Sequence, residues 1–464
     1  MRVVLADLRG REGFVSKDSV AGGYGSRLRP FSRTSGVITN LKRWFNAMPS
    51  GQLAYVAALL ARAGHEVVFV RDGLADADLA LVLTSLVDHR QESAWAEEMR
   101  HRGARVGALG LAASKLPELF EASMDFVVSG EPEHAVMRLA AGERLTGRVE
   151  SPPIQDLDEL PFPRWDLVGG RRGWHLERFI DRPVGGGFPL VASRGCPEFC
   201  TYCPHRILAG YRARSVGNVA DELAELCERH VRPFVVFRDP LFTLDRDRML
   251  ALVDEIARRR LRFRFECETR LDRLDPELLD RLHEAGLRAI TFGVESVSMD
   301  TLRRVGRRPT PPDHQRLVID HCRRLGIATG GFYVLGFLQD NWESIAATIQ
   351  FSVDLTSTFA QFKLLTPYPG TPLWKQLGPL VFERNWERFD GFTPTFNHPS
   401  LTTEELQFLL GAAYTRFYMR PSFLTTYWRV RDGRARRFAH GMDRRVADHH
   451  SRQERLRMRR AVTC

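Results

Sequence analysis

Three closely spaced cysteines constrain this chain more than any other feature. Cys196, Cys200 and Cys203 lie in the stretch SRGCPEFCTYCPH, at the spacing C-x3-C-x2-C. Thiolates are soft ligands that select iron–sulfur clusters or zinc. Three thiolates from one short loop can hold three corners of a cubane cluster and leave its fourth iron open. A structural zinc site normally closes with a fourth Cys or His. His205 is near enough in the sequence to supply that ligand, so the spacing alone leaves both metals open.

Composition predicts a globular protein with more than one domain. The chain has 464 residues, of which 44% are hydrophobic, and this length leaves room for two or three domains. No run of eighteen apolar residues suggests a membrane helix, and the first residues lack the apolar segment of a signal peptide. We therefore expect a cytoplasmic location and no membrane partner. The seven cysteines are too unevenly placed to indicate a disulfide framework.

The net positive charge of the chain is compatible with nucleic-acid binding. The formal net charge is +10, and basic surfaces attract phosphate. However, the arginines are interspersed with Asp and Glu, as in LDRLDPELLDRLHEAG, which is typical of a solvated, ion-paired surface. Nucleic acid is therefore not an expected partner. An RNA-modifying enzyme remains an alternative, with the Arg-rich C-terminal segment as its binding surface.

Residues 1–150 read as an α/β domain. Strand-like apolar runs alternate with helical patterns, which favours a parallel, doubly wound sheet. Such sheets bind ligands at the carboxyl ends of their strands. Residues 8–50 interrupt the alternation with a long irregular stretch rich in Gly, Ser and Arg, and loops of this length are usually functional or disordered.

The remainder divides into three predicted regions. Residues 151–188 form a proline-rich linker. Residues 189–372 contain about six strand–helix units, which indicate a partial (β/α)6 barrel with its active site at the carboxyl ends of the strands. Residues 373–464 read as a helical C-terminal region, including FERNWERFDGF, followed by a basic tail.

The cysteine spacing resembles the signature of the radical SAM superfamily, in which an aromatic residue such as Tyr202 precedes the third cysteine. Members of that family chelate S-adenosylmethionine (SAM) on the open iron of a 4Fe–4S cluster and cleave it to a 5′-deoxyadenosyl radical. The resemblance implies that Cys196, Cys200 and Cys203 ligate the cluster. It also implies Tyr202 as a cofactor contact and a flavodoxin- or ferredoxin-type reductant as a partner.

The N-terminal domain resembles the cobalamin-binding domain of one large radical SAM subgroup, the class B methyltransferase-like enzymes. The resemblance lies in PSGQLAYVAALLARAGHEV and in LPELFEASMDFVVSGEPE. It implies a cobalamin cofactor, with Thr84, Ser85 and Gly110 as candidate corrinoid contacts. Simple caps at strand ends are the alternative for these three residues.

One departure from the cobalamin-binding pattern concerns the lower axial ligand. Many cobalamin proteins supply a His from D-x-H-x-x-G after the first strand, whereas here Asp7 is followed by LRGREG. We interpret His89 as a loop histidine, because it follows a different strand. If cobalamin binds, its lower face is therefore predicted to lack a His ligand.

Polar residues at the predicted barrel strand ends are candidate cofactor ligands. By resemblance, Glu268 and Arg270 hold the amino and carboxylate groups of SAM, and Glu295 and Ser296 hold its ribose and methionine end. A guanidinium fork suits a carboxylate. Asp239 occupies a further strand end. Surface salt bridges are the alternative for these charged residues.

The absence of other cysteine clusters narrows the function. No cysteine precedes Cys196, which argues against the tRNA methylthiotransferase type. The hypothesis is a cobalamin-dependent radical SAM C-methyltransferase that uses SAM twice. One SAM methylates cobalamin, and a second yields the radical that activates an unactivated carbon of a small-molecule, secondary-metabolite substrate. Alternatives are cyclisation, rearrangement or oxidation without net methyl transfer, and a non-catalytic metal-binding sensor. The sequence identifies no catalytic residue beyond the cofactor ligands.

Overall fold

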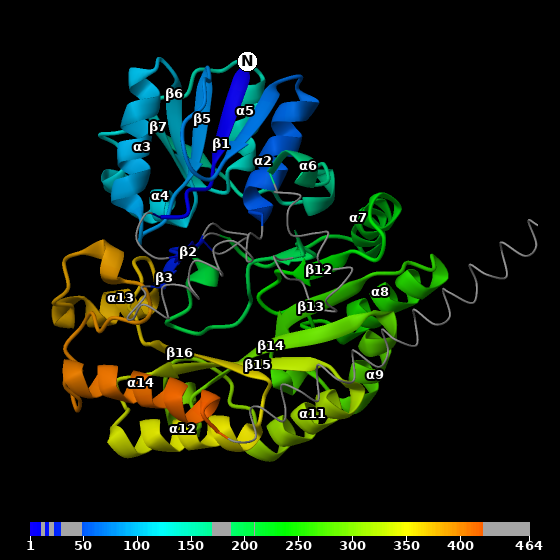
Figure 1. The fold of residues 1–464 in the computed structure, drawn as a ribbon, viewed down its shortest axis with the longest axis vertical. Helices are drawn as coiled ribbons and strands as arrows, with labels where there is room; N and C mark the ends of the chain where they lie inside the picture. The colour runs from blue at the N-terminus through cyan, green and yellow to red at the C-terminus, as the bar shows by residue number, and fades with distance from the viewer. Residues whose placement is uncertain (11–13, 18–22, 29–48, 169–186, 208, 421–464) are drawn as a thin grey trace, which may run out of the picture.

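The computed structural model describes residues 1–10, 14–17, 23–28, 49–168, 187–207 and 209–420. It contains two six-stranded parallel sheets, one in the N-terminal domain and one in a partial barrel (Figure 1). The predicted α/β fold, with an N-terminal doubly wound sheet followed by a partial barrel, is confirmed. Within the described residues, no helix combines the length and apolar character needed to cross a membrane. The predicted basic tail lies outside the described residues.

The N-terminal sheet has the strand order β4-β1-β5-β6-β7-β8. Its strands are β1 (Arg2–Ala6), β4 (Glu66–Val70), β5 (Leu79–Leu83), β6 (Arg105–Leu109), β7 (Phe126–Gly130) and β8 (Gly147–Ser151). The central strand β5 is buried along its whole length, as expected for a sheet covered on both faces. The order reverses between β1 and β5, and this is the position where doubly wound sheets bind ligands.

Helices cover both faces of this sheet because the apolar side chains of its strands alternate between the two faces. Helices α2 (Gly51–Arg62) and α5 (Glu133–Ala140) pack with Val3, Leu5 and Leu81 on one face. Helices α3 (His89–His101) and α4 (Leu111–Lys115) pack with Val4 and Val82 on the other. The short helix α6 (Trp165–Val168) contacts α2 and β4.

A short antiparallel hairpin interrupts the region predicted as an irregular loop. Its strands are β2 (Phe14–Ser16) and β3 (Ser26–Leu28). In Figure 1 the hairpin lies between the N-terminal sheet and the barrel. The prediction of a wholly irregular loop was therefore wrong for these residues, and the other parts of residues 8–50 that the structure describes are non-regular.

The barrel sheet runs in sequence order from β9 to β16, with all neighbours parallel. Its strands are β9 (Phe188–Leu190), β12 (Phe234–Phe237), β13 (Arg264–Thr269), β14 (Leu287–Glu295), β15 (Ala328–Leu335) and β16 (Phe359–Leu364). Its larger helices are α7 (Val216–Arg229), α8 (Arg246–Arg258), α9 (Pro276–Ala285), α11 (Pro312–Leu325) and α12 (Trp342–Leu355). Along β13, Glu266 and Glu268 alternate with buried Phe265 and Cys267, so the two sides of the sheet differ in polarity.

Short elements complete the chain. They are β10 (Ser193–Arg194), β11 (Arg212–Ala213), α10 (Met299–Arg304), α13 (Pro372–Leu377) and the 3-10 turns Pro117–Leu119, Leu157–Glu159, Pro204–Arg206, Leu271–Arg273, Gly378–Leu380 and Trp386–Arg388. Helix α14 (Thr403–Tyr418) packs against β16 and α12.

The predicted helix through FERNWERFDGF is wrong. Only Trp386–Arg388 forms a 3-10 turn there. The side chain of Asn385 accepts a hydrogen bond from the backbone N–H of Glu387. The side chain of Asp390 accepts one from the backbone N–H of Phe392. Such local side-chain bonds offer the backbone an alternative to a helix.

Candidate functional site

The loop that carries the three cysteines follows β10 and is held from several sides. Gly195 has φ +75°, and a Cβ there would lie 2.5 Å from the carbonyl oxygen of Gly210, so only glycine fits. The backbone N–H of Thr201 donates to the carbonyl of Val305 at 2.9 Å, and the Thr201 carbonyl accepts from the N–H of Leu373 at 3.1 Å. The loop is thus fixed against α10 and against the segment after β16.

The chemistry of the three thiols fits an iron–sulfur cluster. Cys200 is buried, while Cys196 and Cys203 are partly exposed. Burial raises the pKa of Cys196, and raises that of Cys203 to about 12. Across the described part of the chain, no three His, Cys, Asp or Glu side chains converge as they would around a single metal ion. Three thiols from one short loop are a donor set that can hold a 4Fe–4S cluster with one iron left open.

Asp239 anchors the strand that leads into the cysteine loop. Its carboxylate accepts from the backbone N–H of Ala192 at 3.0 Å and from the Ser193 hydroxyl at 2.5 Å. Burial raises the pKa of Asp239, and the bonds from Ser193 and Ala192 oppose that shift. The structure therefore places Asp239 beneath the loop as a positioning residue, and contact with a cofactor stays a prediction.

Arg270 ties the carboxyl end of β13 to the cysteine loop. Its guanidinium donates to Glu198 at 3.0 Å and to Asp272 at 2.8 and 3.0 Å. It also donates to the carbonyl of Arg308 at 2.8 Å. These bonds engage all three nitrogens, which supports a role in holding the loop. Glu268 lies two residues earlier on the partly exposed side of β13. The predicted contacts of both residues with SAM stay predictions.

Glu295 ends β14 in a strained conformation. Its φ of 65° is unusual for a residue other than glycine, and such strain clusters at functional sites. Its carboxylate lies 3.6 Å from the guanidinium of Arg307. Burial raises the pKa of Glu295, whereas Arg307 and the nearby Tyr202 hydroxyl lower it. The Tyr202 hydroxyl approaches Glu295 without completing a hydrogen bond of standard geometry. Ser296 is buried and its hydroxyl accepts from the N–H of Ser298.

The cysteines, Tyr202, Glu295 and Arg270 therefore meet at one end of the barrel. Arg307 also belongs to this group, since its guanidinium donates to the carbonyl of Gly293 and hydrogen-bonds to Cys200. Arg307 was not among the predicted site residues, because the arginines at and after the end of α10 carry no local signal in the sequence that one of them turns inward.

The three predicted corrinoid contacts lie at the carboxyl edge of the N-terminal sheet. The Thr84 hydroxyl donates to the carbonyl of Leu109 at 2.8 Å and accepts from the N–H of Ala113. The Ser85 hydroxyl donates to Glu92 at 2.8 Å. Gly110 is the N-cap residue directly before α4 and has φ 109° and ψ −178°, a conformation that only glycine adopts readily. These bonds are those of strand-end caps, and corrinoid contact stays a prediction.

A buried charge cluster occupies the same edge of the sheet. The ammonium of Lys17, in the hairpin segment, donates to the carbonyl of Leu83 at 2.6 Å and lies 2.8 Å from Glu92 and 4.0 Å from Asp7. It therefore reaches the switch point between β1 and β5. His89 does not lie in a loop as predicted, because it begins α3, where its ring bonds to the carbonyl of Leu86.

Buried ion pairs join the N-terminal domain to the cysteine loop. Arg194, two residues before Cys196, lies 2.8 Å from Glu133 and 3.2 Å from Glu131. Arg212 of β11 lies 2.6 Å from Glu131. The two glutamates form the Gly-Glu-x-Glu segment directly after β7. The segment was recognisable in the sequence, but its arginine partners were not.

An aromatic contact joins the hairpin to the other side of the barrel. Tyr24 stacks on Tyr368 with ring centroids 5.2 Å apart, and its hydroxyl donates to the carbonyl of Pro369 at 2.6 Å. Tyr368 and Pro369 follow β16. The carboxyl ends of the strands in both sheets therefore face the same junction.

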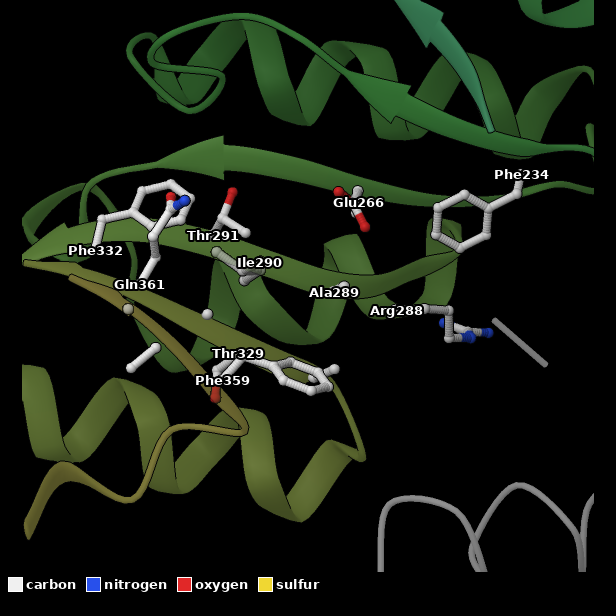
Figure 2. A pocket seen from close by; sticks show the side chains of 14 residues that line it. Phe234, Glu266, Arg288, Ala289, Ile290, Thr291, Thr329, Phe332, Phe359 and Gln361 are labelled. Atoms are coloured by element: carbon white, nitrogen blue, oxygen red, sulfur yellow. The ribbon is translucent and has the colours of Figure 1, made fainter. Parts of the chain in front are cut away.

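A cavity of about 330 Å³ lies inside the barrel, away from the cysteine loop. Its lining comes from strands β12 to β16 and includes Phe234, Glu266, Arg288, Thr291 and Gln361. Figure 2 shows side chains projecting into this space from neighbouring strands. Phe234 begins β12 and Arg288 lies at the start of β14, so the cavity sits toward the amino ends of the strands. Since active sites of such barrels form at the carboxyl ends, we do not assign it a catalytic role.

Comparison with known families identifies the barrel. Residues 190–352 match the family model described as the radical SAM superfamily. This part of the chain is a radical SAM domain. A match to this family indicates a 4Fe–4S cluster and SAM as cofactors, and the matched region contains the three cysteines.

Curated relatives of this chain include methyltransferases and a cyclase. It is 29% identical over 316 residues to an uncharacterized methyltransferase of Pyrococcus horikoshii, covering 66% of each chain. It is 27% identical to the anaerobic magnesium-protoporphyrin IX monomethyl ester cyclase of Rubrivivax gelatinosus, covering 59% of this chain and 48% of that one. The chain thus spans about half to two thirds of the length of these relatives.

Solved structures show the same two-domain fold. The radical SAM methyltransferase TsrM of Kitasatospora setae, with tryptophan and a SAM analogue bound, matches with a TM-score of 0.61 at 19% identity, covering 82% of this chain and 76% of that one. The cobalamin-dependent radical enzyme OxsB, with aqua-cobalamin and SAM bound, matches with a TM-score of 0.62 at 13% identity, covering 89% of this chain and 66% of that one. The chain therefore shares the fold of these two proteins.

Proposed function

We propose that this radical SAM enzyme is a cobalamin-dependent C-methyltransferase that acts on an unactivated carbon of a small molecule. The observation that carries the proposal is the junction between the two sheets. Glu131 and Glu133, directly after β7, clamp Arg194, which lies two residues before Cys196. A ligand on the carboxyl edge of the N-terminal sheet would therefore face a cluster held by the cysteine loop.

The residues present suit these cofactors. Cys196, Cys200 and Cys203 would hold the cluster, with Glu295, Ser296 and the other strand-end residues near SAM. Thr84, Ser85 and Gly110 lie at the edge where the corrinoid would bind. When bound, the cluster supplies the electron that cleaves SAM, and the corrinoid carries the methyl group.

The residues of the chain would hold the cofactors in fixed positions and keep water away from the junction between the two sheets. The buried bonds of Arg194, Arg270 and Asp239 fix the cysteine loop relative to both sheets. The hairpin closes one side of the junction through Tyr24 and Lys17, both of which are buried. Fixed geometry and exclusion of water are what a reaction between two radical or organometallic partners requires.

Product stoichiometry tests the proposal. The reconstituted enzyme, given a substrate and SAM with a deuterated methyl group, should yield one 5′-deoxyadenosine and one S-adenosylhomocysteine for each methylated product. The methyl group in the product should carry the label. Formation of 5′-deoxyadenosine with a modified but unmethylated product would contradict methyl transfer.

A second function, cyclisation without net methyl transfer, has support from one relative. The 27% identity to the magnesium-protoporphyrin IX monomethyl ester cyclase is close to the identity with the uncharacterized methyltransferase. The same assay distinguishes the two functions, because cyclisation produces 5′-deoxyadenosine without S-adenosylhomocysteine.

A further inference from the structure

The cavity inside the barrel exists because small residues face it from adjacent strands. Ala289 of β14 pairs with Ala328 of β15, Thr291 pairs with Gly330, and all four residues line the cavity. A Cβ on Gly330 would lie 3.1 Å from the methyl group of Thr291, so a larger side chain would narrow this space. Barrel interiors are normally filled by bulky branched side chains. Here the small residues leave about 330 Å³, which is the size of a small-molecule pocket.

One end of the cavity adjoins the residues that lie near the cysteine loop. Phe332 and Gln361 line the cavity and pair in one layer with Gly293 of β14. A Cβ on Gly293 would collide with the carboxylate of Glu295, the group that pairs with Arg307. Glu295 therefore rests directly on this layer. A molecule in the cavity would have its nearer end beside the proposed cofactor site.

The lining of the cavity carries no net charge. Among the described residues that line it, Glu266 and Arg288 are the ionisable ones, one negative and one positive. The guanidinium of Arg288 also donates to the backbone carbonyls of His283 and Leu287, at 2.9 and 2.6 Å. A charged group on a ligand would be buried here without a counter-charge of its own, at a high cost in free energy. The cavity therefore suits an uncharged ligand.

Aromatic rings and hydrogen-bonding groups make up much of the remaining lining. Figure 2 shows Thr291 and Gln361 close to the ring of Phe332 at one end of the space, with Phe234 at the opposite end. Phe359 adds a third ring. The Thr291 hydroxyl and the Gln361 amide can each donate and accept hydrogen bonds. Aromatic rings gain stability by packing on other aromatic rings, so the lining suits a ring system with a polar edge.

We infer that this cavity binds the part of the substrate that does not react, and that this part is an uncharged aromatic ring system with a hydroxyl, amide or ring N–H group. The ring would pack among the phenylalanines, and its polar group would bond to Gln361 and Thr291. The reacting carbon would lie beyond Gly293, at the cofactor end of the barrel. The inference rests on the proposed function in requiring a substrate, and it is independent of cobalamin and of net methyl transfer.

Binding of four small probes to the reconstituted full-length enzyme tests the inference. 2-Naphthol is uncharged and aromatic and carries a hydroxyl group. 2-Naphthoate and 2-naphthylmethylammonium place a negative or a positive charge on the same rings, and 2-decalol is the saturated counterpart of 2-naphthol. Equilibrium dialysis gives the Kd of each probe, and the iron and corrinoid contents are measured on the same samples.

Wild type should bind about one 2-naphthol per chain, the charged probes about tenfold or more weakly, and 2-decalol several-fold more weakly. Ala289→Leu places a larger side chain in the cavity and should weaken 2-naphthol binding about tenfold or more. Gln361→Leu removes a hydrogen-bonding group and should weaken it about two- to tenfold. Ala251→Leu makes the same change as the first variant at an exposed position of α8 and should bind like wild type.

No binding of 2-naphthol to wild type, or equal Kd values for wild type and both cavity variants, would overturn the inference. Equal or tighter binding of a charged probe would overturn the assignment of an uncharged ligand, and equal binding of 2-decalol would overturn that of an aromatic one. If Ala289→Leu fails to fold or loses its iron, Gln361→Leu decides the outcome. A sample with full iron and corrinoid that does not bind 2-naphthol contradicts this inference alone, whereas absence of the cofactors contradicts the proposed function.

Discussion

Arg194 and Glu133 join the two sheets through a buried ion pair 2.8 Å long. Arg194 also lies over the ring of Tyr55 in α2, with its guanidinium carbon 5.1 Å from the ring centroid. One side chain thus connects the N-terminal domain to the strand that leads into the cysteine loop. Such a connection explains how the N-terminal sheet and the cluster can keep a fixed separation.

Replacing Arg194 should destabilise the junction. Arg194→Met leaves the buried Glu133 carboxylate without its cation, and breaking a buried pair in this way costs about 3–5 kcal/mol. We expect a lower thermal midpoint together with reduced iron retention. Arg138→Met removes an exposed partner of Glu143 and should leave the thermal midpoint nearly unchanged, because exposed ion pairs contribute little to stability. Equal midpoints for the two variants would contradict the structural role of Arg194.

Each cysteine of the loop should be required for iron binding. Single changes of Cys196, Cys200 or Cys203 to Ala should remove most of the bound iron and abolish SAM cleavage, because the cluster would lose one of only three protein ligands. Iron assay and the visible spectrum after anaerobic reconstitution measure the effect. Cys227→Ala, in α7, is the matched control and should retain the wild-type iron content. A loop variant with full iron content would contradict the ligand assignment.

The contact between Tyr24 and the segment after β16 should contribute to domain packing. Tyr24→Phe removes the hydrogen bond to the carbonyl of Pro369 and should cost about 0.5–1.5 kcal/mol. Tyr24→Ala also removes the stacked ring and should cost about 3–5 kcal/mol. Thermal unfolding measures both costs, and hydrogen exchange at residues 366–372 should accelerate in the alanine variant. If the two variants were equally stable, the stacking contact would have no energetic role.

Asp88 should make stability depend on pH. Burial is the main reason that the pKa of Asp88 is raised to about 7. The nearby carboxylates of Glu92 and Glu387 raise this pKa further, whereas the positive charges of Arg27 and Lys17 lower it. The folded state therefore binds a proton more tightly than the unfolded state. This contribution to stability is complete at low pH and declines as pH rises from about 4 to about 7, by at most about 1.4 kcal/mol per pH unit.

The variant Asp88→Asn tests that dependence. Since asparagine does not titrate, the slope of unfolding free energy between pH 5 and pH 7 should become less negative than in wild type. Denaturant unfolding at a series of pH values gives the slope directly. An unchanged slope would contradict the prediction. It would mean that Asp88 stays ionised throughout this range, held in that form by its ion pair with Arg27 at 2.6 Å.

The sequence could predict features that depend on local patterns. Strands such as β1, β5 and β12 are continuous apolar runs, and the three cysteines lie within one loop, so neither feature needs knowledge of distant contacts. The hairpin was missed because each of its strands has only three residues and because the segment is held by bonds to distant backbone, such as that from Lys17 to Leu83. The Arg194–Glu133 pair was also missed, since it joins residues 61 apart that meet only when the domains pack.

The predicted cofactor ligands at the strand ends also show that local patterns do not reveal contacts between distant residues. Position in the sequence could place Asp239 and Arg270 at the carboxyl ends of barrel strands. It could not show that the Asp239 carboxylate accepts a hydrogen bond from the backbone N–H of Ala192, or that the Arg270 guanidinium donates one to Glu198. Side-chain partners depend on loop conformation, which periodicity does not encode.

The measurement that tests the central claim most directly is the cofactor content after anaerobic reconstitution with iron, sulfide and hydroxocobalamin, followed by desalting. The proposed function predicts about four irons and about one tightly retained corrinoid per chain. Four irons without corrinoid would contradict the cobalamin-dependent mechanism and leave a radical SAM enzyme whose N-terminal domain serves another purpose. Zinc without iron would contradict the cluster itself.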